Sequence, residues 1–129
     1  MHASIKTISQ RYFMHFKLPP SQPKSWHFCD NESDANECAE LVLKGIKRAT
    51  SPSLWWFQAK GEPLPKAGDL NIVTNWARQA LCIIKTTSVA IVPFNQVTEE
   101  YAALEGDKSL AYWQHVHWDY YHRELENTP

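Results

Sequence analysis

Two hydrophobic periodicities alternate along this chain, and their order constrains its fold more than any other feature. Ile5, Tyr12 and Phe16 recur at helical spacing, and the Pro19–Pro20 pair ends that pattern. Residues 25–29 then alternate between polar and apolar side chains, as a strand does. A chain that switches between these periods in short segments predicts an α+β fold with a small, mostly antiparallel sheet.

The rest of the chain continues this alternation, with caps and glycines at the element boundaries. Gly45 is predicted to end the second helix, and Ser53 and Thr98 are predicted N-caps of two short helices. In chain order, the remaining predicted elements are a helix over 35–43, a short helix from 53, strands over 69–74 and 80–92 joined by a hairpin loop at 75–79, a short helix from 98 to 106 and a last helix over 109–126.

Size, charge and cysteine content limit the class of protein. A chain of 129 residues and 14.9 kDa predicts one domain, 1–129, whose first helix lies within 1–20. The net charge of −1 argues against charge-driven binding to duplex DNA or to an anionic membrane. Cys29, Cys38 and Cys82 form no CxxC pair, so we expect reduced, buried thiols in a cytoplasmic protein without a signal peptide or membrane span.

The pattern Gly45-x-Lys47-x-x-Thr50 is the first candidate for chemistry. If a local bend brings the Lys47 amine to the Thr50 hydroxyl, the amine can take the hydroxyl proton and create a nucleophile. The alternative is a solvated surface lysine beside an ordinary strand threonine. Spacing alone favours that alternative, since residues three apart in an extended segment face opposite sides.

Acidic residues and histidines near the end of the chain form two further candidates. Glu105, next to Gly106, can point into a cleft as an acid or orienting group, or it can be a solvated helix end. On the last helix, His115, Asp119 and His122 share one face at a spacing that suits zinc, although a solvated polar face explains them better and no matched fourth ligand follows. We therefore predict no metal and no other cofactor. His117 lies on the opposite face, as a core histidine or a pocket donor.

Six tryptophans in so short a chain require a role in packing or in stacking. Trp55 and Trp56 are adjacent, so both cannot face the core easily, and one is expected at a pocket wall. Trp76 lies in the hairpin loop beside Arg78, and an aromatic ring beside a basic group suits a nucleobase or single-stranded nucleic acid. The other three, Trp26, Trp113 and Trp118, are interpreted as core or helix-packing residues.

Several motifs in order resemble those of the ASCH domain family. They are Gly45-Ile46-Lys47-Arg48-Ala49-Thr50, Ser53-Leu54-Trp55, the segment from Gly61 to Asp69, Cys82-Ile83-Ile84-Lys85-Thr86-Thr87, Val92-Pro93-Phe94-Asn95, and Gly106-Asp107-Lys108-Ser109-Leu110 with Trp113 and His117 behind it. The resemblance covers about Trp26 to Leu125, and the N-terminal helix fits the longer bacterial branch of the family.

This resemblance implies a PUA-like fold, with a small β-barrel and packed helices over 25–126, and a cleft for RNA or a modified nucleoside. Some small relatives hydrolyse the acetyl amide of N4-acetylcytidine, and others are reported as ribonucleases. In the amidohydrolase branch a Lys, a Thr and a Glu carry the reaction, which here implies Lys47 as base, Thr50 as nucleophile and Glu105 as orienting group or acid. The expected substrate-binding residues are Trp55, Trp56, Trp76, Arg78 and His117. A non-catalytic RNA-binding module in translation-related regulation is the alternative.

The chain departs from the family pattern at two places. Relatives often have Glu-Gly-Glu-Gly-Asp where this chain has Glu105-Gly106-Asp107, so the loop is two residues shorter. Relatives also continue into a final apolar strand that closes the barrel, whereas this chain is expected to stop without one. An exposed sheet edge would then be completed by a partner in an exchanged homodimer, or the protein would be a destabilised remnant.

Overall fold

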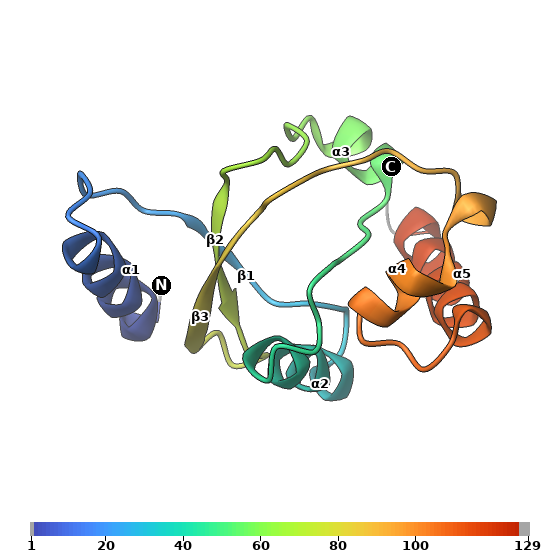
Figure 1. The fold of residues 1–129 in the computed structure, drawn as a ribbon, viewed down its shortest axis with the longest axis horizontal. Helices are drawn as coiled ribbons and strands as arrows, with labels where there is room; N and C mark the ends of the chain where they lie inside the picture. The colour runs from blue at the N-terminus through green and yellow to red at the C-terminus, as the bar shows by residue number, and fades with distance from the viewer. Residues whose placement is uncertain (1, 127–129) are drawn as a thin grey trace. The chain divides into compact units, whose positions relative to one another are not determined.

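The computed structural model of the protein describes residues 2–126 (Figure 1). These residues fold into two compact units, and each unit draws on two segments of the chain. Among the described residues, the first unit combines 2–43 with 66–88, and the second combines 44–65 with 89–126.

The first unit is a three-stranded sheet with two helices. Its strands are β1 (Lys24–Trp26), β2 (Leu70–Thr74) and β3 (Ala80–Lys85), and its helices are α1 (Ala3–His15) and α2 (Glu32–Leu43). In Figure 1, β2 lies between β1 and β3. β1 pairs with β2 in parallel and β2 pairs with β3 antiparallel, so the sheet is mixed and open rather than mostly antiparallel.

Apolar side chains from both faces of this sheet build the core of the first unit. Phe28, Ala39 and Val73 form its buried centre, and half-buried Trp26 and Ile84 pack around them. Helix α1 lies against β3 and buries Ile5 and Phe13. The buried face of α1 differs from the predicted stripe, because Phe13 is buried while Tyr12 is half-buried and Phe16 is exposed.

Two strands are shorter in the structure than the sequence predicts. The strand expected over 25–29 ends at Trp26, and Cys29 takes a positive φ of 63° that breaks an extended run. The strand expected over 80–92 ends at Lys85, which pairs with Leu70, the first residue of β2. Thr86 still exchanges backbone hydrogen bonds with Gly68 and Asp69, which precede β2, and the β-branched residues after Thr86 are irregular and exposed.

The second unit is helical among its described residues. It contains α3 (Leu54–Lys60), a 3-10 turn η1 (Phe94–Gln96), α4 (Glu99–Leu104) and α5 (Leu110–Glu126). The predicted caps are confirmed, since the Ser53 hydroxyl accepts from the Trp56 amide and the Thr98 hydroxyl accepts from the Tyr101 amide. Helix α4 packs on α5, where Trp113 is fully buried.

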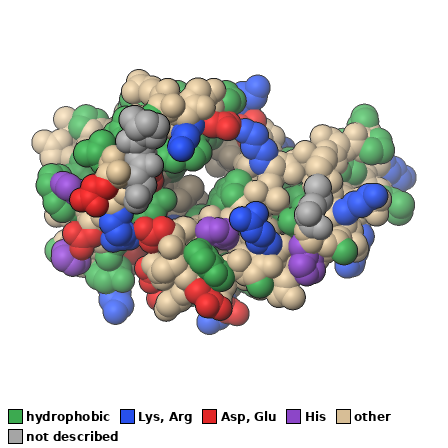
Figure 2. Space-filling view, turned by 180° about the vertical axis from the view of Figure 1, so that it is seen from behind, with side chains coloured by type: hydrophobic (Ala, Val, Ile, Leu, Met, Phe, Trp, Pro, Cys, Tyr) green, Lys and Arg blue, Asp and Glu red, His purple; other side chains and the backbone are tan. Residues whose placement is uncertain are grey.

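These elements confirm the α+β class. None of the helices in the described part of the chain has the length and apolar character that a membrane crossing requires. On the face drawn in Figure 2, basic side chains are spread widely, whereas acidic side chains gather on the left and centre of the view. The predicted lack of a closing strand concerns residues 127–129, which lie outside the described residues.

Candidate functional site

A buried carboxylate is the centre of the second unit. Glu105 caps the C-terminus of α4, where its amide donates to the Tyr101 carbonyl, and only 2% of its side chain is exposed. Among the described residues, Glu105 is the only charged residue that is buried. A buried charge is costly unless donors surround it, so its partners define the site.

Lys47 supplies the opposite charge. Its Nζ lies 3.3 Å from Glu105 Oε1 and donates to the Ala49 carbonyl at 3.0 Å, and its side chain is 8% exposed. The segment that carries Lys47 is tied to the end of α4, because the Arg48 amide donates to the Leu104 carbonyl at 2.6 Å. The Lys47–Glu105 contact is therefore an ion pair taken almost entirely out of water.

His117 and Trp113 complete the shell from helix α5. The Trp113 indole nitrogen donates to Glu105 Oε2, and the His117 ring stacks on the Trp113 ring with 4.1 Å between centroids. His117 Nδ1 lies 2.8 Å from the Trp113 carbonyl, and its Nε2 lies 3.4 Å from Glu105 Oε1. If Nδ1 donates to that carbonyl, a hydrogen bond from Nε2 to Glu105 requires the doubly protonated ring.

A hydroxyl group that the sequence analysis did not single out also contacts the carboxylate. Ser51 Oγ lies 2.8 Å from Glu105 Oε2 and 2.9 Å from the Tyr101 hydroxyl. The Tyr121 hydroxyl donates to the Ser51 carbonyl, and the Tyr101 hydroxyl donates to the Thr50 carbonyl at 2.9 Å. Two tyrosines from two helices thus hold the 50–51 backbone beside the carboxylate.

The surroundings of Glu105 determine its ionisation. Burial raises the pKa of Glu105, but the hydrogen bond from His117, the charge of Lys47 and the hydrogen bond from Trp113 outweigh it. The net pKa of Glu105 lies below the ordinary value, so the carboxylate is ionised near neutral pH. Burial and the charge of Glu105 raise the pKa of Tyr121 well above its usual range, which leaves that hydroxyl protonated and able to donate.

The structure brings together three of the predicted site residues, Lys47, Glu105 and His117. Thr50 is exposed, and it enters this network through its carbonyl oxygen. Ser51 was missed, although a signal existed: in an extended segment residues 47 and 51 share a face, whereas 47 and 50 do not. Its partners Tyr101 and Tyr121 come from distant helices, and no local pattern connects them to it.

The other predicted binding residues come from other segments of the chain than the residues that contact Glu105. Trp55 and Trp56 are half-buried in α3 of the same unit, where the Trp56 ring meets Phe57 edge-on at 5.1 Å. Trp76 and Arg78 belong to the first unit, in the turn between β2 and β3, and the Trp76 ring lies 4.9 Å from the His27 ring.

His115, Asp119 and His122 lie along one face of α5. His115 Nε2 lies 3.5 Å from Asp119 Oδ2, and both side chains are exposed. His122 Nδ1 lies 2.8 Å from the Trp118 carbonyl. Across residues 2–126, no three His, Cys, Asp or Glu side chains gather in a group that could hold a metal ion.

Comparison with known proteins places this geometry in a family. The ASCH domain profile matches residues 24–129. Protein EF3133 from Enterococcus faecalis is similar in structure, with a TM-score of 0.93 and 34% identity over 98% of this chain and 78% of that one. The ASCH domain from Lactobacillus crispatus has a TM-score of 0.88 and 37% identity over 98% of this chain and 84% of that one, and the match assigns this chain a PUA-like fold. No curated protein matches. With the profile covering most of its length, the chain belongs to the ASCH domain family.

Proposed function

We propose that this chain binds RNA or a modified nucleoside and hydrolyses the acyl amide of N4-acetylcytidine. The observation that carries the proposal is the buried contact of 3.3 Å between Lys47 and Glu105. Such a pair positions one amine with few degrees of freedom, which is what a general base requires. The exposed Thr50, three residues from Lys47, is open to a ligand.

The proposed reaction forms and breaks one covalent intermediate. Once Lys47 has released its own extra proton, its amine accepts the hydroxyl proton of Thr50 while Thr50 Oγ bonds to the acetyl carbon. The carbonyl electron pair moves to oxygen and returns as the bond to N4 breaks, and N4 receives the proton from Lys47. Cytidine leaves, and water then hydrolyses the acetyl ester on Thr50 to give acetate and restore the hydroxyl.

In this reaction Glu105 orients Lys47. A glutamate that is ionised near neutral pH has no proton to give to the leaving amine, so the lowered pKa of Glu105 argues against an acid role. His117, at 3.4 Å from the same carboxylate, helps to hold it in place. Trp55 and Trp56 are the proposed stacking surface for the base in this unit.

The experiment is a mass-spectrometric assay of N4-acetylcytidine and a panel of other acylated nucleosides. Thr50→Ala should lower turnover by at least about 10⁴-fold, and Lys47→Ala by about 10²–10⁴-fold. Lys60→Ala is the matched control, because Lys60 is an exposed lysine of the same unit, and it should leave turnover unchanged. Ser51→Ala keeps the proposed nucleophile and should lose about tenfold through displacement of Glu105.

The same series contains the results that would refute this assignment. If Ser51→Ala abolishes turnover and Thr50→Ala keeps it, the nucleophile is Ser51 and the proposed role of Thr50 is wrong. If Lys47→Ala and Lys60→Ala behave alike, Lys47 is not the base.

A non-catalytic RNA-binding module is the second candidate, and a specific observation favours it. The protein itself supplies every partner that Glu105 needs, from Lys47, Ser51, Trp113 and His117, which is also how a purely structural buried charge is arranged. Binding of an oligoribonucleotide without turnover of any acylated nucleoside would support the module. Cleavage of the oligoribonucleotide would instead indicate a ribonuclease.

A further inference from the structure

A pocket in the first unit carries basic and aromatic side chains that the proposed reaction does not use. It lies among α1, β1 and the β2–β3 turn and has a volume of about 490 Å³, within the roughly 300–1,000 Å³ of small-molecule sites. Its walls include His2, Ser25, Trp26, His27 and Arg78. None of the described residues that line it is Asp or Glu, so every titratable side chain around it is of the basic type.

The β2–β3 turn holds Arg78 in a conformation that favours glycine. Its φ is 66°, and its amide donates to the Asn75 carbonyl at 3.0 Å. The Asn75 side chain bridges the turn, since its Oδ1 accepts from the Gln79 amide at 2.9 Å and its Nδ2 donates to Gln79 Oε1 at 2.9 Å. A residue with a Cβ is strained at this φ, so what arginine adds over glycine is its guanidinium.

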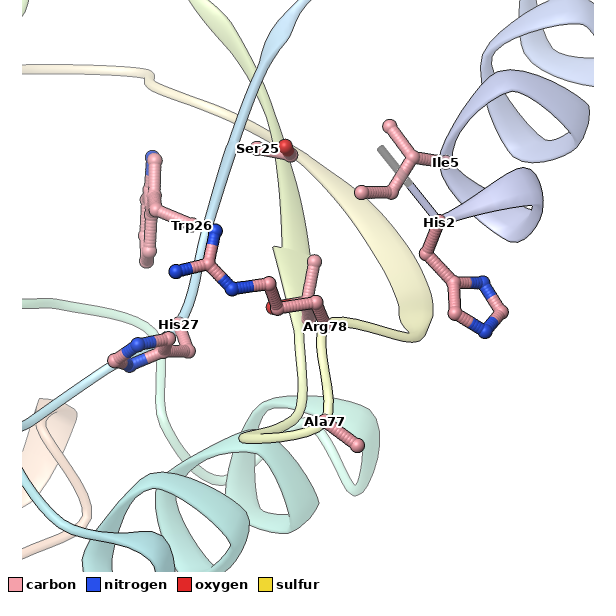
Figure 3. A pocket seen from close by; sticks show the side chains of 8 residues that line it. His2, Ile5, Ser25, Trp26, His27, Ala77 and Arg78 are labelled. Carbon is pink, nitrogen blue, oxygen red and sulfur yellow. The ribbon is translucent and has the colours of Figure 1, made fainter.

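That guanidinium is available to a ligand. Arg78 is exposed, and no carboxylate among the described residues pairs with it. Figure 3 shows its side chain extending from the turn toward β1, where Trp26 and His27 lie, while Ile5 points toward the sheet from α1. A planar guanidinium in a pocket without acidic residues suits the oxygens of a phosphate group.

The aromatic rings of the pocket are held in fixed orientations. The Trp26 indole nitrogen donates to Asn71 Oδ1 at 3.0 Å, and the Trp26 ring meets Phe28 edge-on at 4.9 Å. His27 Nδ1 lies 3.0 Å from the Phe28 carbonyl. Rings that are already ordered offer a base a stacking surface with little further loss of conformational entropy.

We propose that this pocket binds a nucleoside monophosphate group, either free or as one unit of single-stranded RNA. Arg78 contacts the phosphate, and the base stacks on Trp26 or His27. Inorganic phosphate alone leaves the rings uncovered, and a nucleoside alone leaves Arg78 without a counter-charge. The site uses neither Lys47 nor Glu105, so it stands whether or not the chain hydrolyses acylated cytidine.

The test is calorimetric titration of the full chain with cytidine monophosphate, cytidine and inorganic phosphate. The monophosphate should bind at least about tenfold more tightly than either part. Arg78→Gln should weaken its binding by about tenfold or more, whereas Arg11→Gln, an exposed arginine of α1 outside the pocket lining, should stay within about twofold. Arg78→Gly removes the same guanidinium and relieves the positive φ, so a matching loss in that variant excludes a folding defect.

An oligoribonucleotide of about six units distinguishes the two sources of the phosphate. If it binds more tightly than the monophosphate and Arg78→Gln weakens both, the ligand is a unit of a strand. The salt dependence of that binding, as log K against log salt, should then fall in slope by about 0.7 in Arg78→Gln. If Arg78→Gln weakens the monophosphate and the oligoribonucleotide binds no more tightly than it, the ligand is the free nucleotide.

Three results would overturn the proposal. Equal losses in Arg78→Gln and Arg11→Gln would mean that only long-range charge is involved. Equal affinity for cytidine and its monophosphate would show that the pocket makes no favourable contact with the phosphate. Loss of monophosphate binding in Lys47→Ala would place the ligand at the Glu105 site, independently of whether that variant retains turnover.

Discussion

Replacing Glu105 with glutamine tests whether the buried carboxylate is held by charge or by shape. Glu105→Gln keeps the side-chain volume and one carbonyl acceptor, but it removes the negative charge. It also places an NH₂ group, which can only donate, among side chains that themselves donate hydrogen bonds to Glu105. Lys47, 8% exposed, then has no opposite charge at 3.3 Å. Breaking a buried pair by removing one partner typically costs about 3–5 kcal/mol.

We expect Glu105→Gln to lower the free energy of unfolding at pH 7 by about 3 kcal/mol. For a domain of this size, that corresponds to a fall in melting temperature of about 10 °C. Glu37→Gln is the matched control, because Glu37 is an exposed residue of α2, and it should leave the melting temperature close to that of the wild type. Urea denaturation followed by circular dichroism gives the free energies, and an unchanged m-value shows that the two-state comparison holds.

The pH dependence of the free energy of unfolding is a sharper test of the role of the Glu105 charge. Because the pKa of Glu105 is lower in the folded state than its ordinary value of 4.5, its contribution is fully present above that value. The contribution is lost as the pH falls below 4.5 and through the lower folded pKa. The difference in stability between the wild type and Glu105→Gln should therefore narrow as the pH is lowered from neutrality through this range. A difference that stays constant with pH would show that shape, not charge, holds the site, and would refute the role assigned to the Glu105 charge.

The remaining predictions concern one cap and the state of assembly. Ser53→Ala should lower the free energy of unfolding by about 1–2 kcal/mol in urea denaturation, because the hydroxyl caps α3 and also donates to Glu124 Oε1 at 2.7 Å. Ser53→Thr keeps both bonds and should recover most of the loss, so a loss of equal size in both variants would contradict the capping role. In size-exclusion chromatography we expect a peak near 14.9 kDa, because β1 has only three residues and begins with Lys24, features that discourage pairing at its edge. A peak near twice that mass would instead support the exchanged homodimer.

Local signals predicted the helices of this chain well, because caps act over three or four residues. Ser53 and Thr98 each accept from an amide three residues on, so the sequence contains both partners of each contact. Strand ends depend on a partner elsewhere in the chain. The β-branched residues after Lys85 have the propensity for a strand, but only Thr86 finds backbone partners, in Gly68 and Asp69 just before β2, and the pairing ends there.

The candidate site shows the same division between local and distant information. Lys47 and Glu105 are 58 positions apart, and it was the resemblance to the family, not spacing, that paired them. Ser51 can be predicted only when its distant partner is known. If a buried carboxylate lies beside an extended segment, the residues on the same face as Lys47 are expected to donate hydrogen bonds to that carboxylate. Thr50, on the alternate side, is then left with its hydroxyl for a ligand, and its backbone is fixed by Tyr101. Under the proposed function, this segment supplies a structural hydroxyl at Ser51 and a reactive one at Thr50, and this is why the comparison of Thr50→Ala with Ser51→Ala carries more information than either variant alone.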